Sequence, residues 1–265
     1  MRRRLDAELV RRGLAGSLGE ARERILSGRV TVGGRPAHKA GSLVADDEPL
    51  DVSGPGRPFA SRGGEKLAPA LDRFRIDPSG RRCLDAGAST GGFTDVLLER
   101  GAAHVIAVDV GYGQLAWHLR TDPRVMVMDR TNVRDLRGRD LPYRPDLVVA
   151  DLSFISLEKV VPALTGVAAR HADLVLLIKP QFEAARADVA GGGVVVDPEI
   201  RRRAVEAVAA ACRDAGAGPF DVAASPLLGP AGNVEIFLWA RNGESGRQLD
   251  IEAAFRQAPA RGRHA

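Results

Sequence analysis

Apolar positions divide the chain into two stretches with different patterns. Over the first 52 residues they fit two short helices followed by brief extended runs. One helix is expected from Leu5 to Arg12. A second opens at Ser17, where the S-x-x-E spacing to Glu20 forms a capping box, and stops at Gly28. Short strands are expected over residues 29–32, 43–44 and 49–52. The pattern predicts a small α+β unit over residues 1–52.

Beyond residue 60, runs that are apolar on both faces alternate with helical stretches. The runs are CLDAG, HVIAVDV, VMVMD, DLVVADL and DLVLLIK, and closing strands follow in FDVAASPLL and NVEIFLWA. Such runs predict an α/β fold with a doubly wound, mostly parallel sheet over residues 61–241. The segment SGPGRPFA, residues 53–60, is the expected linker. Residues 242–265 are polar and weakly patterned, which predicts a disordered tail.

Charge is distributed unevenly between these stretches. The formal net charge is +4, yet the first 40 residues carry ten basic side chains against four acidic ones. This excess favours contact with a polyanion, although a solvated surface would have the same composition. Without a series of aromatic residues, the unit is expected to read RNA shape and backbone. The residues expected to contact RNA are Arg2, Arg4, Arg11, Arg22, Arg24, Arg29 and Lys39.

The expected location of the protein follows from what the sequence lacks. No apolar run approaches the length of a membrane span, and the arginines at the N-terminus do not precede a signal-peptide core. Cys83 and Cys212 have neither zinc-ligand spacing nor the number that a disulfide framework needs. We therefore expect a cytoplasmic protein with no metal site and no membrane partner.

The segment DAGASTGGF, residues 85–93, follows the first strand of the sheet and opens a helix, a common place for a ligand. Gly87, Ser89 and Gly91 fit the G-x-S-x-G elbow of hydrolases, but that site needs a later histidine and only His264 lies beyond the last strand. A dinucleotide fingerprint needs glycine where Ser89 stands. The sequence therefore disfavours both a hydrolase site and a dinucleotide-binding site.

Acidic residues at three successive strand ends favour S-adenosylmethionine, whose sulfonium is cationic. Asp85 suits the cationic end, Asp109 the ribose hydroxyls and Asp129 the adenine amino group. A single acid of this kind can merely cap a helix, whereas three in succession favour a ligand. The residues expected to bind the cofactor are Asp85, Gly87, Ala88, Ser89, Thr90, Gly91, Asp109, Val110, Asp129, Thr131 and Asn132.

Lysines are scarce: only four of the 38 basic residues are lysines, at positions 39, 66, 159 and 179. Where arginine is the default, a retained lysine indicates a need for a side chain that can lose its proton. Lys179 and Asp151 end two neighbouring strands, so both are expected at the ligand edge of the sheet. Lys66 precedes the first strand and Glu235 lies in the closing one.

These four residues are the candidate catalytic set. Lys179 is the candidate base for a ribose hydroxyl, Asp151 and Glu235 would orient the lysines, and Lys66 would hold the ribose or stabilise its alkoxide. The alternative is that the lysines form purely structural ion pairs. An amino acceptor fits less well because DLSF is unlike an NPPY segment, and no cysteine is placed to attack a base carbon.

Two resemblances extend this interpretation. The run RLDAELVRRGLAGSLGEARERILSGRVTVGGRPAHKAG resembles the RNA-binding domain of ribosomal protein S4. The motifs FASRGGEKL, DAGASTGGFTD, DLSFISL, LIKPQFE and GPAGNVE are similar to those of the TlyA, or hemolysin A, family of rRNA methyltransferases, over residues 1 to about 240. The catalytic core of that family is similar to the FtsJ (RrmJ) type of RNA 2′-O-methyltransferase.

The resemblance implies S-adenosylmethionine as cofactor and a tetrad of Lys66, Asp151, Lys179 and Glu235. It also implies ribosomal RNA or ribosomal subunits as partner, with cytidine in large-subunit rRNA as the target and, in some members, small-subunit rRNA as well. Two alternatives stay open. A cytolysin would need a secretion signal or a long amphipathic membrane segment, and neither is evident. A non-catalytic RNA-binding or assembly protein would have lost the tetrad or the loop, and both are present.

Overall fold

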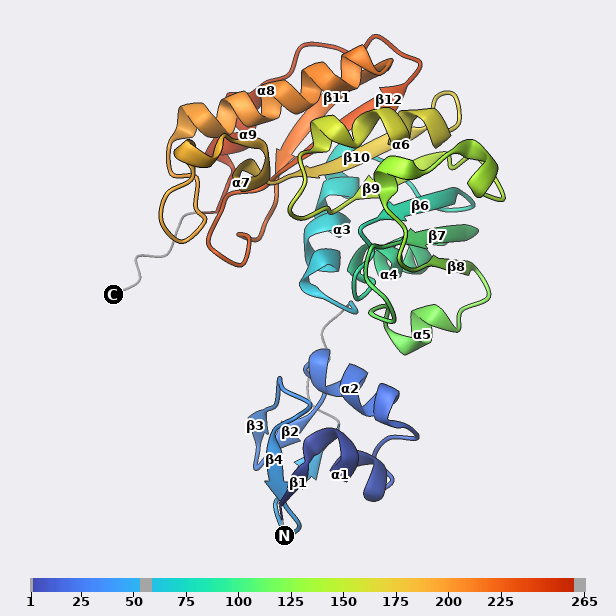
Figure 1. The fold of residues 1–265 in the computed structure, drawn as a ribbon, viewed down its shortest axis with the longest axis vertical. Helices are drawn as coiled ribbons and strands as arrows, with labels where there is room; N and C mark the ends of the chain where they lie inside the picture. The colour runs from blue at the N-terminus through green and yellow to red at the C-terminus, as the bar shows by residue number, and fades with distance from the viewer. Residues whose placement is uncertain (1, 53–58, 260–265) are drawn as a thin grey trace.

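The computed structural model describes residues 2–52 and 59–259, which form a small N-terminal unit and a larger α/β unit (Figure 1). The N-terminal elements are β1 (Arg2–Arg4), α1 (Leu5–Arg11), α2 (Leu18–Leu26), β2 (Thr31–Val32), β3 (Arg35–Pro36), β4 (Leu43–Ala45) and β5 (Leu50–Asp51). They enclose a core of their own, in which Leu5, Leu9 and Ile25 are fully buried.

The predicted helices and short strands of the N-terminal unit are present, with one addition. Ser17 caps α2 by accepting a hydrogen bond from the Glu20 amide at 3.1 Å. The Glu20 carboxylate accepts from the Gly16 amide rather than from Ser17 itself, so the capping box is displaced by one residue. Strand β1, which pairs antiparallel with β4, has no apolar alternation because its sequence is RRR, and only the tertiary pairing defines it.

The larger unit has these elements: α3 (Arg62–Phe74), β6 (Arg82–Ala86), α4 (Gly92–Glu99), β7 (His104–Val108), α5 (Trp117–Arg120), β8 (Val125–Met128), β9 (Leu147–Ala150), α6 (Val161–Val167), β10 (Asp173–Ile178), α7 (Pro180–Glu183), α8 (Pro198–Asp214), β11 (Ala217–Ala224), β12 (Ile236–Asn242) and α9 (Ile251–Arg256). Short 3₁₀ turns lie at Val133–Asp135, Gly138–Asp140, Leu157–Lys159 and Arg186–Asp188.

The predicted doubly wound sheet is confirmed. Its strand order is β11-β12-β10-β9-β6-β7-β8, and only the pairings of β12 are antiparallel. Alternate residues of the central strands face opposite layers: Leu84 packs with α6 and α8, whereas Cys83 packs with α3 and α4. The strand order reverses between β6 and β9, so a crevice opens at their carboxyl ends.

The C-terminal segment differs from the sequence-based expectation. Residues 251–256 form α9 instead of a disordered tail, with Asp250 accepting a hydrogen bond from the Ala253 amide at 2.9 Å. Ala254 is buried, and Ile251 and Phe255 pack against the core at helical spacing. The apolar stripe of α9 is short and lies among polar residues, so the sequence pattern did not predict this helix. Residues 260–265 lie outside the described part of the chain.

The linker was expected over residues 53–60, but its last two residues, Phe59 and Ala60, pack against the larger unit and belong to it. Residues 53–58 lie outside the described residues. Within the described ranges, no helix is both long enough and apolar enough to cross a membrane.

Candidate functional site

The loop after β6 turns tightly at the crevice. Gly87 has φ +87° and Gly91 has φ +100°, a region that side chains avoid. A Cβ on Gly87 would lie 2.5 Å from the carbonyl oxygen of Asp151, and one on Gly91 would lie 2.2 Å from Leu119 Cδ1. Both glycines therefore permit a close approach of backbone to neighbouring segments. Ser89, with φ +49°, takes the strained position between them.

Asp85 is the last residue but one of β6, just before this loop, and is fully buried. Its Oδ2 accepts a hydrogen bond from Thr94 Oγ1 of α4 at 2.7 Å, while Oδ1 has no hydrogen-bond partner in the described structure. Burial raises the pKa of Asp85 to about 7, and the nearby negative charges of Asp151 and Asp109 add to the effect. The sequence placed Asp85 beside the cationic end of a cofactor. In the structure Asp85 is fully buried and lines neither the larger cavity nor the adjoining pocket described below.

A cavity of about 440 Å³ opens beside the loop, within the size range of small-molecule sites. Five of the residues predicted to bind the cofactor line it: Gly87, Ser89, Asp109, Val110 and Asn132. An adjoining pocket of about 290 Å³ is lined by the predicted residues Gly87, Ala88, Ser89 and Thr90. The loop and the ends of β7 and β8 thus meet at one cavity.

Asp109 holds the cavity wall in shape. Its two carboxylate oxygens accept hydrogen bonds from the amides of Ser89 at 2.8 Å and Gly111 at 2.7 Å. An ionised carboxylate has about four acceptor positions, so it can also receive two hydroxyl donors. The Asp109 side chain therefore connects the two loops that border the cavity.

Asp129 and Thr131 do not line either cavity. The Asp129 carboxylate accepts hydrogen bonds from Arg120 at 2.7 Å and from the Gly113 amide at 3.2 Å, and the Arg120 hydrogen bond lowers its pKa. Thr131 donates to the Asp129 carbonyl at 3.1 Å. Both residues brace the loop, and of the three residues predicted here only Asn132 lines the cavity.

Sequence reasoning missed several lining residues, namely Gln114, Val133, Leu152, Ser153, Phe154, Ile155 and Val160. Most are apolar residues in irregular segments, which no periodicity marks. Phe154 carries the one local signal, a large aromatic residue directly after a strand. It has φ +63°, is 91% exposed, and its ring centroid lies 5.1 Å from that of Phe182.

Lys179 and Asp151 are brought together as predicted. Lys179 Nζ lies 2.5 Å from Asp151 Oδ1 and donates a hydrogen bond to Ser153 Oγ at 2.9 Å. Lys179 is 9% exposed, and Asp151 lines both the 440 Å³ cavity and its neighbour. Asp151 and Ser153 line the larger cavity, and Lys179 lies behind them in contact with both.

Lys66 and Glu235 form a second pair. Lys66 projects from α3 and donates a hydrogen bond to Glu235 Oε2 at 2.6 Å; both residues are buried. Glu235 directly precedes β12, and its Oε1 has no hydrogen-bond partner among the described residues. The first turn of α3 lines the smaller pocket together with Asp151. The four candidate residues are thus arranged as two lysine–carboxylate pairs.

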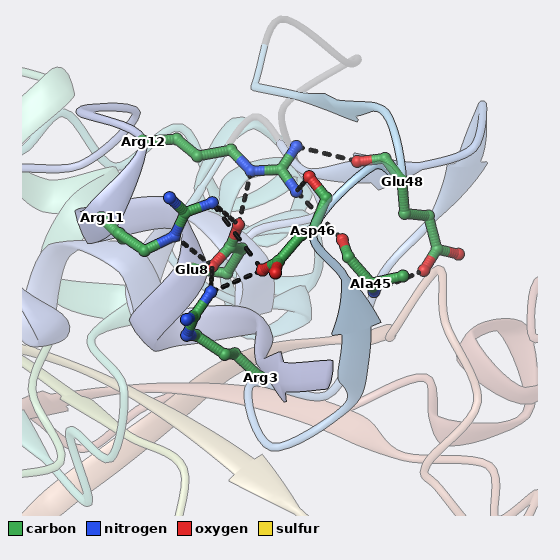
Figure 2. A network of polar contacts seen from close by, with 7 residues as sticks. All are labelled: Arg3, Glu8, Arg11, Arg12, Ala45, Asp46 and Glu48. Atoms are coloured by element: carbon green, nitrogen blue, oxygen red, sulfur yellow. Dashed lines mark hydrogen bonds and ion pairs between the residues drawn. The ribbon is translucent and has the colours of Figure 1, made fainter. Parts of the chain in front are cut away.

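Two buried acids, Asp6 and Glu8, hold three of the arginines predicted to contact RNA: Arg4, Arg11 and Arg22. Glu8 of α1 is fully buried and accepts hydrogen bonds from Arg11 and Arg12 (Figure 2). Arg12 also donates to the backbone carbonyls of residues 45, 46 and 48, so its role is structural. The Arg11 side chain stays 49% exposed. Hydrogen bonds from Arg11 and Arg12 lower the pKa of Glu8 to about 2.

Asp6, in the same first turn of α1, plays the same part. It accepts hydrogen bonds from Arg4 at 2.9 and 3.1 Å and from Arg22 at 2.9 Å, and the Arg4 contact is the main cause that lowers its pKa to about 2. Arg24 bonds to Glu20 and to the Leu14 carbonyl and is half-buried. The other predicted contacts, Arg2, Arg29 and Lys39, are exposed.

This fold and loop are those of a methyltransferase attached to an RNA-binding domain. Residues 59–242 match the family model of the FtsJ-like methyltransferases, and residues 3–48 match that of the S4 domain. The chain therefore belongs to the FtsJ-like methyltransferases and is an enzyme of that class. The N-terminal unit is called the S4 domain below, and the larger unit the methyltransferase domain.

Within that class the chain belongs to the TlyA family. It is 58% identical over 241 residues to the 16S/23S rRNA (cytidine-2′-O)-methyltransferase TlyA of Mycobacterium tuberculosis, covering 91% of this chain and 90% of the relative. It is 37% identical to Hemolysin A of Brachyspira hyodysenteriae, over 88% of this chain and 97% of the relative. A structure from Streptococcus thermophilus, also named as a hemolysin, matches with a TM-score of 0.75 and 35% identity, over 97% of this chain and 95% of that one.

Proposed function

We propose that this enzyme transfers a methyl group from S-adenosylmethionine to the 2′-hydroxyl of a cytidine ribose in ribosomal RNA, in the cytoplasm. The observation that carries the proposal is the ion pair of the buried Lys179 with Asp151, which itself lines the cavity beside the glycine loop. The name of the M. tuberculosis relative supports cytidine as the nucleoside and rRNA of either subunit as the substrate.

The residues present fit S-adenosylmethionine. The unpartnered Oδ1 of Asp85 supplies negative charge beneath the loop for a cationic amino acid and sulfonium. Asp109 offers acceptors to the ribose hydroxyls, while Val110 and Val133 form apolar walls for adenine beside Asn132. When bound, this cofactor supplies a methyl group on a positively charged sulfur, which is open to attack by a nucleophile.

The lysine–carboxylate pairs supply the proton chemistry. Lys179 would accept the proton of the ribose 2′-hydroxyl, so that the oxygen can bond to the methyl group of a donor bound in the cavity, and the donor would keep the electrons of the bond that breaks. Asp151 and Ser153 fix the direction of Nζ by the contacts at 2.5 and 2.9 Å. Lys66, held by Glu235, stabilises negative charge developing on the ribose oxygen.

Because Lys179 is only 9% exposed, we expect the target nucleotide to leave its stack so that its ribose can reach the lysine. The exposed ring of Phe154 lies beside the cavity and offers a stacking surface for an unpaired base. The half-exposed arginines of the S4 domain, fixed on Asp6 and Glu8, supply the phosphate contacts.

The test is methyl transfer to unmodified rRNA by the wild type and by Lys179→Ala. We expect the variant to lose activity by about 100-fold or more, because the base is removed, with unchanged S-adenosylmethionine affinity. Lys159→Ala, which removes an exposed lysine, is the matched control. Label should map to a ribose oxygen.

The same assay also tests the alternative of a non-catalytic RNA-binding protein and, separately, the assignment of Lys179 as the base. A non-catalytic RNA-binding protein would show no transfer by the wild type to 16S or 23S rRNA or to either subunit, despite tight RNA binding. Equal transfer by wild type and Lys179→Ala would refute the assigned base while leaving the reaction class intact.

A further inference from the structure

A cleft separates the S4 domain from the methyltransferase domain on the side of the cofactor loop. It encloses about 560 Å³ and is lined on one side by α2, through Arg22, Glu23 and Leu26. The opposite wall is the segment after β7, where Tyr112 and Trp117 are the largest side chains. In Figure 1 this is the place where α2 of the S4 domain approaches α5.

The cleft adjoins the proposed cofactor site. Thr90 lines both this cleft and the pocket at the glycine loop, and Gln114 lines both this cleft and the 440 Å³ cavity. RNA held by the S4 domain must pass near this boundary to present a nucleotide at the cofactor. A ligand in the cleft would therefore sit between the two sites of RNA contact.

The width of the cleft is fixed by a bridge between the domains. His118 of α5 places Nδ1 2.6 Å from Glu23 of the S4 domain and Nε2 3.6 Å from Asp95 of α4. Asp95 also accepts a hydrogen bond from the Ala60 amide at 2.7 Å, which ties the start of the methyltransferase domain to the same carboxylate. The two walls are thus positioned before any ligand binds.

The apolar surface in the cleft is unusual for a protein surface in contact with water. Trp117 is 57% exposed, Tyr112 66% and Leu26 52%, and all three line the same space. The guanidinium of Arg130 lies 4.3 Å from the centre of the Tyr112 ring. Aromatic rings accompanied by guanidinium groups form the usual stacking surface for unpaired bases.

Positive groups at the rim suit a nucleotide rather than an apolar peptide. Arg22 uses Nε for Asp6, and its side chain is 54% exposed. Arg120 binds Asp129 through Nη2, whereas its Nη1 is buried with no hydrogen-bond partner among the described residues. A buried donor of this kind needs an acceptor, and a phosphate or base oxygen would supply one.

We infer that this cleft binds an unpaired base of the substrate RNA, stacked on Trp117 with Tyr112 and Leu26 beside it, and with Arg22 and Arg120 contacting its phosphates. The inference rests on the proposed function and adds a second subsite for the same RNA, outside the cavity of the target nucleotide. This subsite links the S4 domain to the catalytic edge.

Tryptophan fluorescence tests the contact directly. The chain has two tryptophans, and Trp239 packs against Phe74 and Phe220 in the methyltransferase domain, so Trp239→Phe leaves Trp117 as the sole reporter. We expect 23S or 16S rRNA transcripts to quench this emission along the same curve that anisotropy of labelled RNA gives. A perfectly paired RNA duplex should leave it unchanged, because its bases are stacked on one another.

Kinetics supply the second measurement. Trp117→Ala should raise KM for rRNA about 10-fold, the usual effect of one lost base stack, with kcat and cofactor affinity unchanged. Trp117→Phe keeps a stacking ring and should retain near-wild-type KM. Unchanged cofactor affinity shows that the variant has kept its fold next to Thr90.

The outcomes separate this inference from the proposed function. If rRNA is bound and methylated without quenching of Trp117, or if Trp117→Ala has the wild-type KM, the cleft does not bind an RNA base. The proposed methylation reaction would be unaffected by that result. Quenching by S-adenosylmethionine alone also overturns it, by assigning the cleft to the cofactor. If the wild type neither binds nor methylates rRNA, both proposals fall together.

Discussion

At the scale of single residues, Asp85 shows how position sets chemistry. The carboxyl is fully buried below the glycine loop, and burial raises its pKa to about 7. A cationic ligand nearby favours the ionised carboxylate, so ligand binding and proton release are coupled. The protonated carboxyl attracts the cation less. Cofactor affinity is therefore expected to respond to pH in a range where most carboxyls do not titrate.

The expected result is that S-adenosylmethionine binds with constant affinity above pH 7 and progressively more weakly below it, by up to about tenfold per pH unit. Asp85→Asn should remove this dependence because it cannot ionise. Isothermal titration calorimetry from pH 5.5 to 8.5 measures the affinity for S-adenosylmethionine in the wild type and in Asp85→Asn. An equal pH slope in wild type and variant would show that another group is responsible.

The same scale distinguishes arginines with different tasks. Arg12 donates hydrogen bonds to Glu8 and to three backbone carbonyls and is 22% exposed, whereas Arg11 also bonds to Glu8 but stays 49% exposed (Figure 2). Adjacent arginines in the sequence are therefore not equivalent. A count of basic residues cannot separate a structural guanidinium from one available to phosphate.

At the scale of elements, α1 depends on the ionisation of its buried acid. The pKa of Glu8 falls from 4.5 to about 2, so its contribution to stability is complete above pH 4.5 and is lost as pH falls through about 2. Glu8→Gln should lower the melting temperature of the S4 domain at pH 7, because the charged hydrogen bonds from Arg11 and Arg12 are weakened.

The difference between wild type and Glu8→Gln should shrink as pH is lowered from 4.5 towards 2.5, where Glu8 itself approaches protonation. Differential scanning calorimetry across that range is the measurement. Glu252→Gln, at an exposed position in α9, is the control and should match the wild type at every pH. A difference that stays constant with pH would mean that shape, not charge, is what Glu8 provides.

At the scale of the whole molecule, one histidine joins the two domains. His118 lies between Glu23 and Asp95, and hydrogen bonds to Asp95 and Glu23 raise its pKa to about 9. A raised histidine pKa means that the bridge is complete below 6.5, the ordinary value, and is lost as pH rises through about 9. The domain arrangement is thus expected to loosen only in alkaline solution.

Förster transfer between dyes on cysteines introduced at Leu18→Cys in α2 and Arg203→Cys in α8 reports this arrangement, since the natural cysteines are buried. The distance distribution should broaden between pH 8 and 10 in the wild type and be broad already at pH 7 in His118→Gln. His104→Gln, at an exposed histidine on β7, should behave as wild type. A distribution that ignores both pH and His118 would show that other contacts hold the domains.

Much of the architecture could be predicted because its signals are local. Five apolar runs separated by helices specify β6 to β10, and the S-x-x-E spacing specifies the start of α2. The signals for β1 and α9 are weak: an RRR strand and a short apolar stripe gain their stability from pairing with β4 and from packing on the core.

What the sequence by itself determined is which residues stand at strand ends and glycine turns, because the period of burial dictates where each strand stops. It thereby placed Lys179, Asp151 and Asp109 at one edge of the sheet. Only the tertiary structure decided the partners: Lys66 with Glu235 across 169 positions, Asp129 turned to Arg120, and Glu23 joined to His118. These pairings depend on how distant segments meet in space, which local periodicity does not encode.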